Sequence, residues 1–107
     1  MIVTVFRSRL MPDVGDDYVA LADRMSELAV TMPGYLSSKD FVAEDGERVT
    51  VVEFESEEAQ RAWRMHPEHR AAQRKGRETY YEEYRLQICE VKRESSFKRQ
   101  EDVAAAE

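Results

Sequence analysis

The residues best suited to chemistry lie close together in the second half of the chain. Residues 63–69 (WRMHPEH) hold the only tryptophan and both histidines, and residues 80–84 (YYEEY) hold three tyrosines. An imidazole can move a proton near neutral pH, an indole can stack on a flat molecule, and a phenol can hydrogen-bond an oxygen substituent. Together these residue types predict a site for a small aromatic molecule.

The helix predicted after Pro67 places two polar residues on an inward stripe. His69 and Gln73 share this stripe with the small residues Ala72 and Gly76, which suit close packing against a sheet. A buried polar group needs a partner or a wet pocket. His69 is therefore expected either to bond a tyrosine or a backbone carbonyl, or to line a pocket as the catalytic base, with Gln73 contacting the substrate.

His66 precedes Pro67, and its predicted role is to cap the helix that follows. His66 and His69 lie three residues apart with Glu68 between them, which leaves a metal site as an alternative. The sequence contains no zinc-type Cys/His spacing, glycine-rich phosphate loop or nucleophile elbow. We predict no metal and no cofactor.

Three aromatic residues are predicted to contact the substrate, with core packing as the alternative for each. Trp63 lies on the inner side of its helix and would stack a flat ring. Tyr81 and Tyr84 begin the last strand, where a phenol would orient a substrate hydroxyl. Alternation places Tyr84 on one strand face with Leu86 and Ile88.

Arg7 on the first strand is the cation predicted to reach this site. If it points inward, it would stabilise a phenolate or peroxide anion. The alternative is an ion pair with Glu53 or Glu55 on a neighbouring strand. The arginines of residues 70–77 are expected to form a solvated helix face.

Apolar periodicity and turn residues predict the order β-α-β-β-α-β. This is the ferredoxin-like α+β arrangement, a four-stranded antiparallel sheet with its helices on one face. The uncovered face would be apolar, so we expect a homodimer. Strands are expected at 2–10, 35–43, 48–54 and 80–93, and helices at 16–32, 56–65 and 67–76.

The chain's 107 residues predict one domain at 1–94 followed by a polar tail at 95–107, in which Phe97 would pack on a partner subunit. Cys89 is expected to be a buried, inert hydrophobe. The net charge of −6 argues against nucleic-acid binding. No run of about 18 apolar residues predicts a membrane span, and no signal peptide is visible, so a cytoplasmic location is expected.

Four segments together resemble the antibiotic biosynthesis monooxygenase (ABM) family of the dimeric α+β barrel superfamily. They are residues 32–35 (MPGY), Asp45-Gly46 before the strand at 49–54, residues 62–69 (AWRMHPEH), and Tyr81 to Tyr84 entering the last strand. The resemblance covers about residues 2–93. It implies a homodimer whose sheets form a barrel, with one pocket per subunit between sheet and helices.

The family includes cofactor-independent oxygenases of aromatic polyketides, quinol oxygenases, heme-degrading enzymes and proteins of unknown activity. The heme-degrading branch uses a histidine ten residues after the tryptophan and an asparagine on the first strand. Here Gln73 follows Trp63 by ten residues and the first strand has no asparagine. The resemblance therefore favours a monooxygenase of phenol, quinol or polyketide-like aromatics. The alternatives are a non-catalytic barrel that binds a small hydrophobic ligand and, third, a heme-binding relative.

Overall fold

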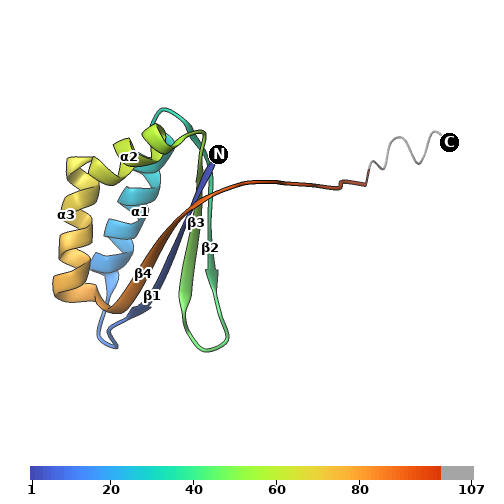
Figure 1. The fold of residues 1–107 in the computed structure, drawn as a ribbon. Coiled ribbons are helices and arrows are strands. Elements are labelled where there is room, and N and C mark those ends of the chain that lie inside the picture. Colours follow the sequence, from blue (N-terminus) through green and yellow to red (C-terminus); the bar gives the residue numbers. More distant parts are fainter. Residues whose placement is uncertain (100–107) are drawn as a thin grey trace.

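A four-stranded antiparallel sheet is covered on one face by helices (Figure 1), and the predicted ferredoxin-like α+β fold is confirmed. The computed structural model describes residues 1–99. The strand order is β2-β3-β1-β4, so the first and third strands are central. The elements are β1 (Ile2–Leu10), α1 (Asp16–Val30), β2 (Tyr35–Val42), β3 (Arg48–Phe54), α2 (Glu57–Met65), α3 (Pro67–Lys75), a single π-helical turn η1 (Gly76–Tyr80), and β4 (Tyr81–Glu90).

Local sequence sets the ends of the helices. The Ser56 hydroxyl accepts a hydrogen bond from the backbone N–H of Ala59 at 3.1 Å and caps α2. Pro67, which has no N–H to satisfy, stands in the first turn of α3. The helix α1 ends at Val30, two residues earlier than expected, because residues 31 and 32 bond back over three residues and tighten the last turn.

The register of the strands determines which side chains face the helices. Thr4, Phe6 and Ser8 alternate along β1 toward the helical side. Across β4 they pair with Ile88, Leu86 and Tyr84, so the predicted common face of these three β4 residues is confirmed. Beside this face, Phe54 is fully buried and packs in one cluster with Ala29 and Trp63.

The opposite face of the sheet carries Val3 and Val5 of β1 and Val49 and Val51 of β3, all only half-buried. No described element covers this face. Cys89 pairs with Val3 there and is exposed, so its expected burial is wrong. The reason is that β4 is an edge strand and that the helices cover only the other side of the sheet.

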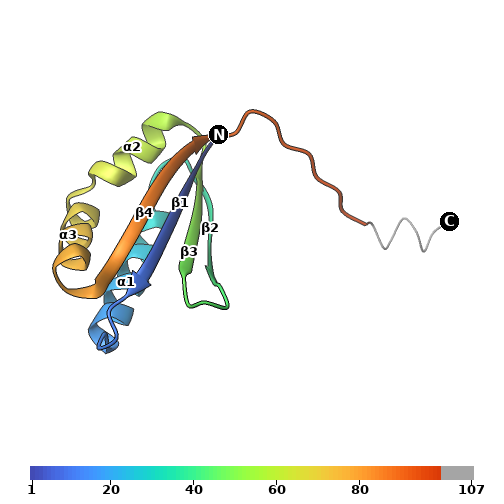
Figure 2. The ribbon, with the colours of Figure 1, turned by 60° about the horizontal axis from the view of Figure 1, so that its bottom comes forward.

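The chain beyond β4 leaves the sheet as an extended segment (Figure 2). The N–H of Val91 donates to the carbonyl of Met1 at 3.1 Å, which ties the two ends of the sheet domain together. Phe97 is 80% exposed. The remainder of the expected tail, residues 100–107, lies outside the described residues. Within residues 1–99, no helix has both the length and the apolar character to span a membrane.

Candidate functional site

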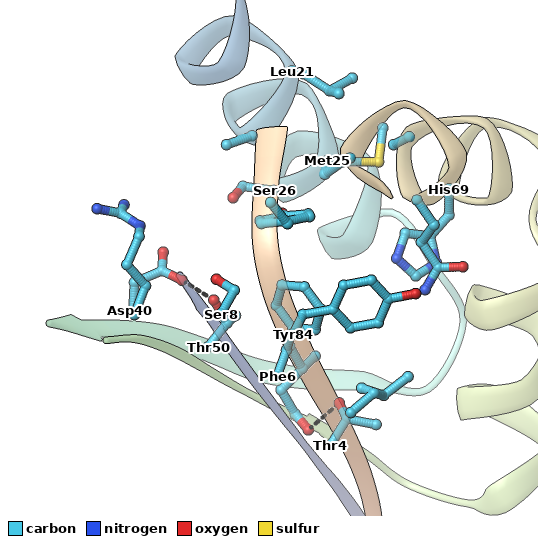
Figure 3. Close-up of a pocket in the computed structure, with 18 of the residues that line it drawn as sticks. Thr4, Phe6, Ser8, Leu21, Met25, Ser26, Asp40, Thr50, His69 and Tyr84 are labelled. Carbon is cyan, nitrogen blue, oxygen red and sulfur yellow. Dashed lines mark hydrogen bonds between the residues drawn. The ribbon is translucent and has the colours of Figure 1, made fainter. Parts of the chain in front are cut away.

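A cavity of about 210 Å³ lies between the helical face of the sheet and the helices (Figure 3). The strands contribute Phe6 and Leu86, α1 contributes Met25 and Tyr18, and the helices that follow β3 contribute Trp63. A cavity of about 150 Å³ in another protein holds one benzene molecule. This one therefore accommodates an aromatic ring with substituents, or two fused rings.

The cavity wall brings together most of the residues singled out in the sequence. The inward stripe of α3 and the inner face of β4 both border this one space between the sheet and the helices. Of the residues predicted to form the site, those on its wall are Trp63, His69, Gln73, Tyr81 and Tyr84. Their roles in binding or catalysis remain predictions.

Arg7 is not on this wall, so its predicted inward position is wrong. It alternates with Phe6 and Ser8 and points to the other face of the sheet. There its Nε and Nη2 atoms each lie 3.0 Å from a carboxylate oxygen of Glu47, a bidentate ion pair. The expected ion-pair partners, Glu53 and Glu55, were wrong as well. The strand register places Arg7 opposite Val49, beside Glu47.

His69 stacks on the indole of Trp63 and is held in one tautomer. The ring centroids are 4.1 Å apart and the planes meet at 14°. Nδ1 of His69 lies 3.1 Å from the backbone oxygen of Trp63. Because a carbonyl oxygen only accepts, Nδ1 carries the proton and Nε2 keeps a free lone pair. Among the described residues, Nε2 has no hydrogen-bond partner.

The electrostatic surroundings keep His69 neutral. Burial lowers the pKa of His69, the hydrogen bond to the Trp63 carbonyl partly opposes this, and His66 lowers it further. The imidazole is therefore in its base form at neutral pH. A neutral ring with a fixed proton on Nδ1 and a free Nε2 has what a general base requires.

His66 has the structural role that the sequence predicted. Its Nδ1 accepts a hydrogen bond from the backbone N–H of Glu68 at 3.1 Å and caps α3. This lone pair is thus occupied. Within residues 1–99, no group of three or more histidine, cysteine or acidic side chains is arranged to bind a metal ion.

Tyr81 and Tyr84 form an aromatic wall with Phe6, whose ring centroid lies 5.5 Å from the first and 5.4 Å from the second. Burial raises the pKa of Tyr81 far above its usual range, and Tyr18 adds to the effect, so this phenol stays protonated and can donate. The hydroxyl of Tyr84 accepts from Nη1 of Arg77 at 3.2 Å. A phenol that accepts a hydrogen bond keeps its own O–H, so Tyr81 and Tyr84 can both donate from this wall.

The polar residues at the other end of the cavity were not predicted from the sequence. The labelled side chains of Ser8, Asp40 and Thr50 lie across the view from His69, with Phe6 between them (Figure 3). The Thr50 hydroxyl donates to the Asp40 carboxylate at 2.5 Å. Sequence periodicity cannot bring β2 and β3 together in register, so it gave no indication of this pair.

Gln60 was also missed, although the sequence did contain an indication of it. It precedes Trp63 by three residues, so the two share one face of α2. Gln60 lines the cavity and is only 2% exposed. Its Oε1 atom is buried without a hydrogen-bond partner among the described residues.

Comparison with known proteins places this chain in a family. The chain belongs to the antibiotic biosynthesis monooxygenase family, whose model matches residues 1–75. It is 39% identical over 80 residues to the uncharacterized protein YqjZ of Bacillus subtilis (strain 168), covering 75% of this chain and 70% of that protein.

Solved structures show the same fold. Rv0793 from Mycobacterium tuberculosis superposes with a TM-score of 0.77 at 21% identity, covering 89% of this chain and 98% of that one. SnoaB, a cofactor-independent oxygenase from Streptomyces nogalater, gives a TM-score of 0.71 at 12% identity, covering 87% and 94%. At these identities the likeness establishes the fold alone.

Proposed function

We propose that this protein is a cofactor-independent monooxygenase that oxidises a small electron-rich aromatic molecule with O₂. The observation that carries the proposal is the neutral His69 with a free Nε2, stacked on Trp63 in the wall of a cavity of aromatic size. Family membership supports the general class. A phenol, a quinol or a polyketide-like aromatic has the required electron density.

The chemistry can be written for a two-ring hydroquinone. Nε2 of His69 takes a hydroxyl proton, and the phenolate gives one electron to O₂. The two radicals combine at the neighbouring ring carbon to form a peroxide anion, which takes the proton back from the imidazolium. The hydroperoxide then loses water and leaves a new carbonyl on the ring. O₂ gains four electrons and the substrate loses four, so one oxygen atom enters the product and one leaves as water.

The remaining side chains would orient the ring and stabilise charge. The indole of Trp63 offers a flat surface, and the wall formed with Phe6 confines the substrate from the sheet side. The protonated hydroxyl of Tyr81 can donate to an oxyanion as it develops. An electron-rich phenolate reduces O₂ by itself, so deprotonation, orientation and charge stabilisation are sufficient contributions from the protein.

Oxygen uptake with 1,4-dihydroxynaphthalene tests the proposal. We expect uptake above the uncatalysed rate, after metal chelation and with no flavin or nicotinamide added. With ¹⁸O₂, one labelled atom should enter a hydroxynaphthoquinone. Formation of unlabelled naphthoquinone and hydrogen peroxide alone would contradict monooxygenation. Saturable binding without any oxygen uptake, across a panel of phenols and quinols, would favour the non-catalytic binding protein instead.

We also propose a homodimer formed through the uncovered face of the sheet. Val5 and Val51 lie opposite each other at its centre, on adjacent central strands, and only a second layer would remove them from water. Sedimentation should therefore show a species of twice 12.5 kDa at micromolar concentration. Val51→Lys should shift it toward monomer, whereas Val19→Lys, on an exposed position of α1, should not. A 12.5 kDa wild-type species would overturn the proposal.

A further inference from the structure

We propose that the ligand of this cavity carries a carboxylate, and that Arg48 at the start of β3 is the side chain that binds it. The inference rests on the proposed aromatic site but not on its oxygen chemistry. It assigns a binding role to a residue outside the pair formed by His69 and Trp63. It also narrows the ligand from an electron-rich aromatic molecule to a hydroxyaryl carboxylic acid.

Strand register directs Arg48 toward the cavity. Arg48 pairs with Ser8 between β3 and β1, and Ser8 belongs to the helical face of the sheet. Paired residues of antiparallel strands point to the same face, so Arg48 projects toward the helices. It is half-buried and lines the cavity. Arg7 alternates to the opposite face, so Arg48 is the cation that the sheet contributes to the cavity wall.

The positive charge of Arg48 acts on another residue of the same wall. Burial raises the pKa of Tyr81 far above its usual range, and the charge of Arg48 partly opposes this rise. Such an effect requires the guanidinium to lie near the phenol, because the interaction of two groups weakens with distance. Tyr81 itself lines the cavity. The guanidinium of Arg48 and the phenol of Tyr81 therefore border one space.

Arg48 has no carboxylate partner within residues 1–99. The ion pairs found there all involve other arginines, and none of the side-chain hydrogen bonds involves Arg48. Asp40, the carboxylate on the same face of the neighbouring strand β2, accepts from the hydroxyl of Thr50 instead. A guanidinium has five N–H donors, and a carboxylate on the ligand can accept from two of them at once.

The cavity wall is positively charged although the protein is acidic. The charged residues that line it are Arg48, Arg64 and Asp40, because His69 is neutral. Two guanidinium groups and one carboxylate leave an excess of positive charge, whereas the whole chain carries −6. Arg64 is also half-buried and forms no ion pair in the part of the chain that the structure describes. Charge complementarity therefore favours an anionic ligand.

Arg48 and His69 lie toward opposite ends of the cavity. Ser8, the register partner of Arg48, lies across the view from His69, with Phe6 between them (Figure 3). A ligand that reaches both residues needs its hydroxyl at one end of the ring system and its carboxylate at the other. The volume of about 210 Å³ admits two fused rings. Hydroxynaphthoic acids substituted at opposite ends have this form.

Calorimetry with two probes tests the inference apart from turnover. The probes are 6-hydroxy-2-naphthoic acid, which is ionised at neutral pH, and 6-hydroxy-2-naphthamide, which has nearly the same shape but no charge. The wild type should bind the acid about 10- to 100-fold more tightly than the amide, as expected for a charge-assisted contact. The preference should shrink at high salt. Equal affinities, or binding of neither probe, would overturn the proposal.

Two variants of Arg48 assign the preference to this residue. Arg48→Gln should abolish it, whereas Arg48→Lys, which keeps the charge but loses the planar fork, should retain part of it. Arg61→Gln is the matched control, because it removes the same charge from an exposed position of α2 that does not line the cavity. It should leave the preference unchanged. Urea denaturation should give similar midpoints for all three variants, because neither arginine loses an ion pair.

Each outcome bears on one claim. A preference that survives Arg48→Gln, or that is lost only in Arg64→Gln, would remove Arg48 from recognition. Unfolding of both Arg48 variants would show a structural role for this arginine and would also overturn the proposal. If Arg48 governs binding of the acid but no oxygen is consumed, the binding inference stands and the oxygenase proposal fails. If oxygen is consumed and neutral aromatics bind as tightly as acids, only the inference about Arg48 fails.

Discussion

Replacing His69 by alanine should lower the rate of oxygen uptake at saturating substrate by about 10²–10⁴-fold, the usual cost of losing a general base. The expected loss depends on one atom, Nε2 of His69. Nδ1 of His69 is committed to the Trp63 carbonyl at 3.1 Å, so Nε2 is the proton acceptor. The loss should fall mainly on kcat, because Trp63 still binds the ring.

His66→Ala is the matched control for this prediction. Its imidazole caps α3 through a hydrogen bond from Glu68 N–H, so its loss should cost about 1 kcal/mol of stability and little in rate. Oxygen uptake and chemical denaturation, measured on both variants, separate the two roles. Similar small rate losses for His66→Ala and His69→Ala would remove His69 from the mechanism.

The pH dependence should follow the lowered pKa of His69. The neutral form is the base, so kcat/KM should rise with pH, with a midpoint below the ordinary histidine value of 6.5, and level off before neutrality. Protonation of His69 should also destabilise the folded protein. The free energy of unfolding should fall as the pH drops from the pKa of His69 in the unfolded chain through its lower pKa in the folded protein.

Trp63 offers a direct measurement of the same titration, because it is the only tryptophan and stacks on His69. Its fluorescence should change as the imidazole gains a proton, with a midpoint below 6.5. The change should vanish in His69→Ala and persist in His66→Ala. A midpoint above 6.5 would contradict a neutral base at this position.

Sequence periodicity predicted most of the candidate site because two walls of the cavity each belong to a single element, α3 or β4. The stripe of α3 placed His69 and Gln73 on one side, and alternation along β4 placed Tyr84 with Leu86. Within one element, the covalent geometry of the backbone fixes which side chains share a face. No knowledge of the partner element is needed for such a prediction.

Periodicity does not determine which face of a strand meets the helices, and Arg7 illustrates the limit. Along β1, both alternating sets begin with apolar residues, so neither set is marked as the inner one. The ion pair with Glu47 depends on how β1 pairs with β3, which tertiary packing sets. The contact between Asp40 and Thr50 depends on the register of the β2–β3 hairpin, which the turn between the two strands sets. Cys89 was misplaced for a related reason, since its edge strand is covered on one side only.

Gly34→Ala should destabilise the protein by about 2–5 kcal/mol, because a left-handed backbone and a steric clash act together there. Gly34 has φ of 84°, and a Cβ atom at this position would lie 2.5 Å from the Cβ of Ala59 in the first turn of α2. The carbonyl of Gly34 also accepts from the N–H of Glu55 at 2.8 Å, so the turn cannot move away freely.

Gly46→Ala separates the cost of the left-handed backbone from the cost of the steric clash. Gly46 has φ of 91°, but a Cβ there would meet nothing within 4 Å, so only the backbone cost of about 1–2 kcal/mol is expected. Urea denaturation of both variants gives the comparison. The excess loss in Gly34→Ala measures how firmly α2 is held against the turn after α1, and hence how firmly Trp63 and Gln60 are positioned on the cavity wall. Equal losses would mean that α2 shifts at little cost and that Trp63 is not held rigidly on the cavity wall.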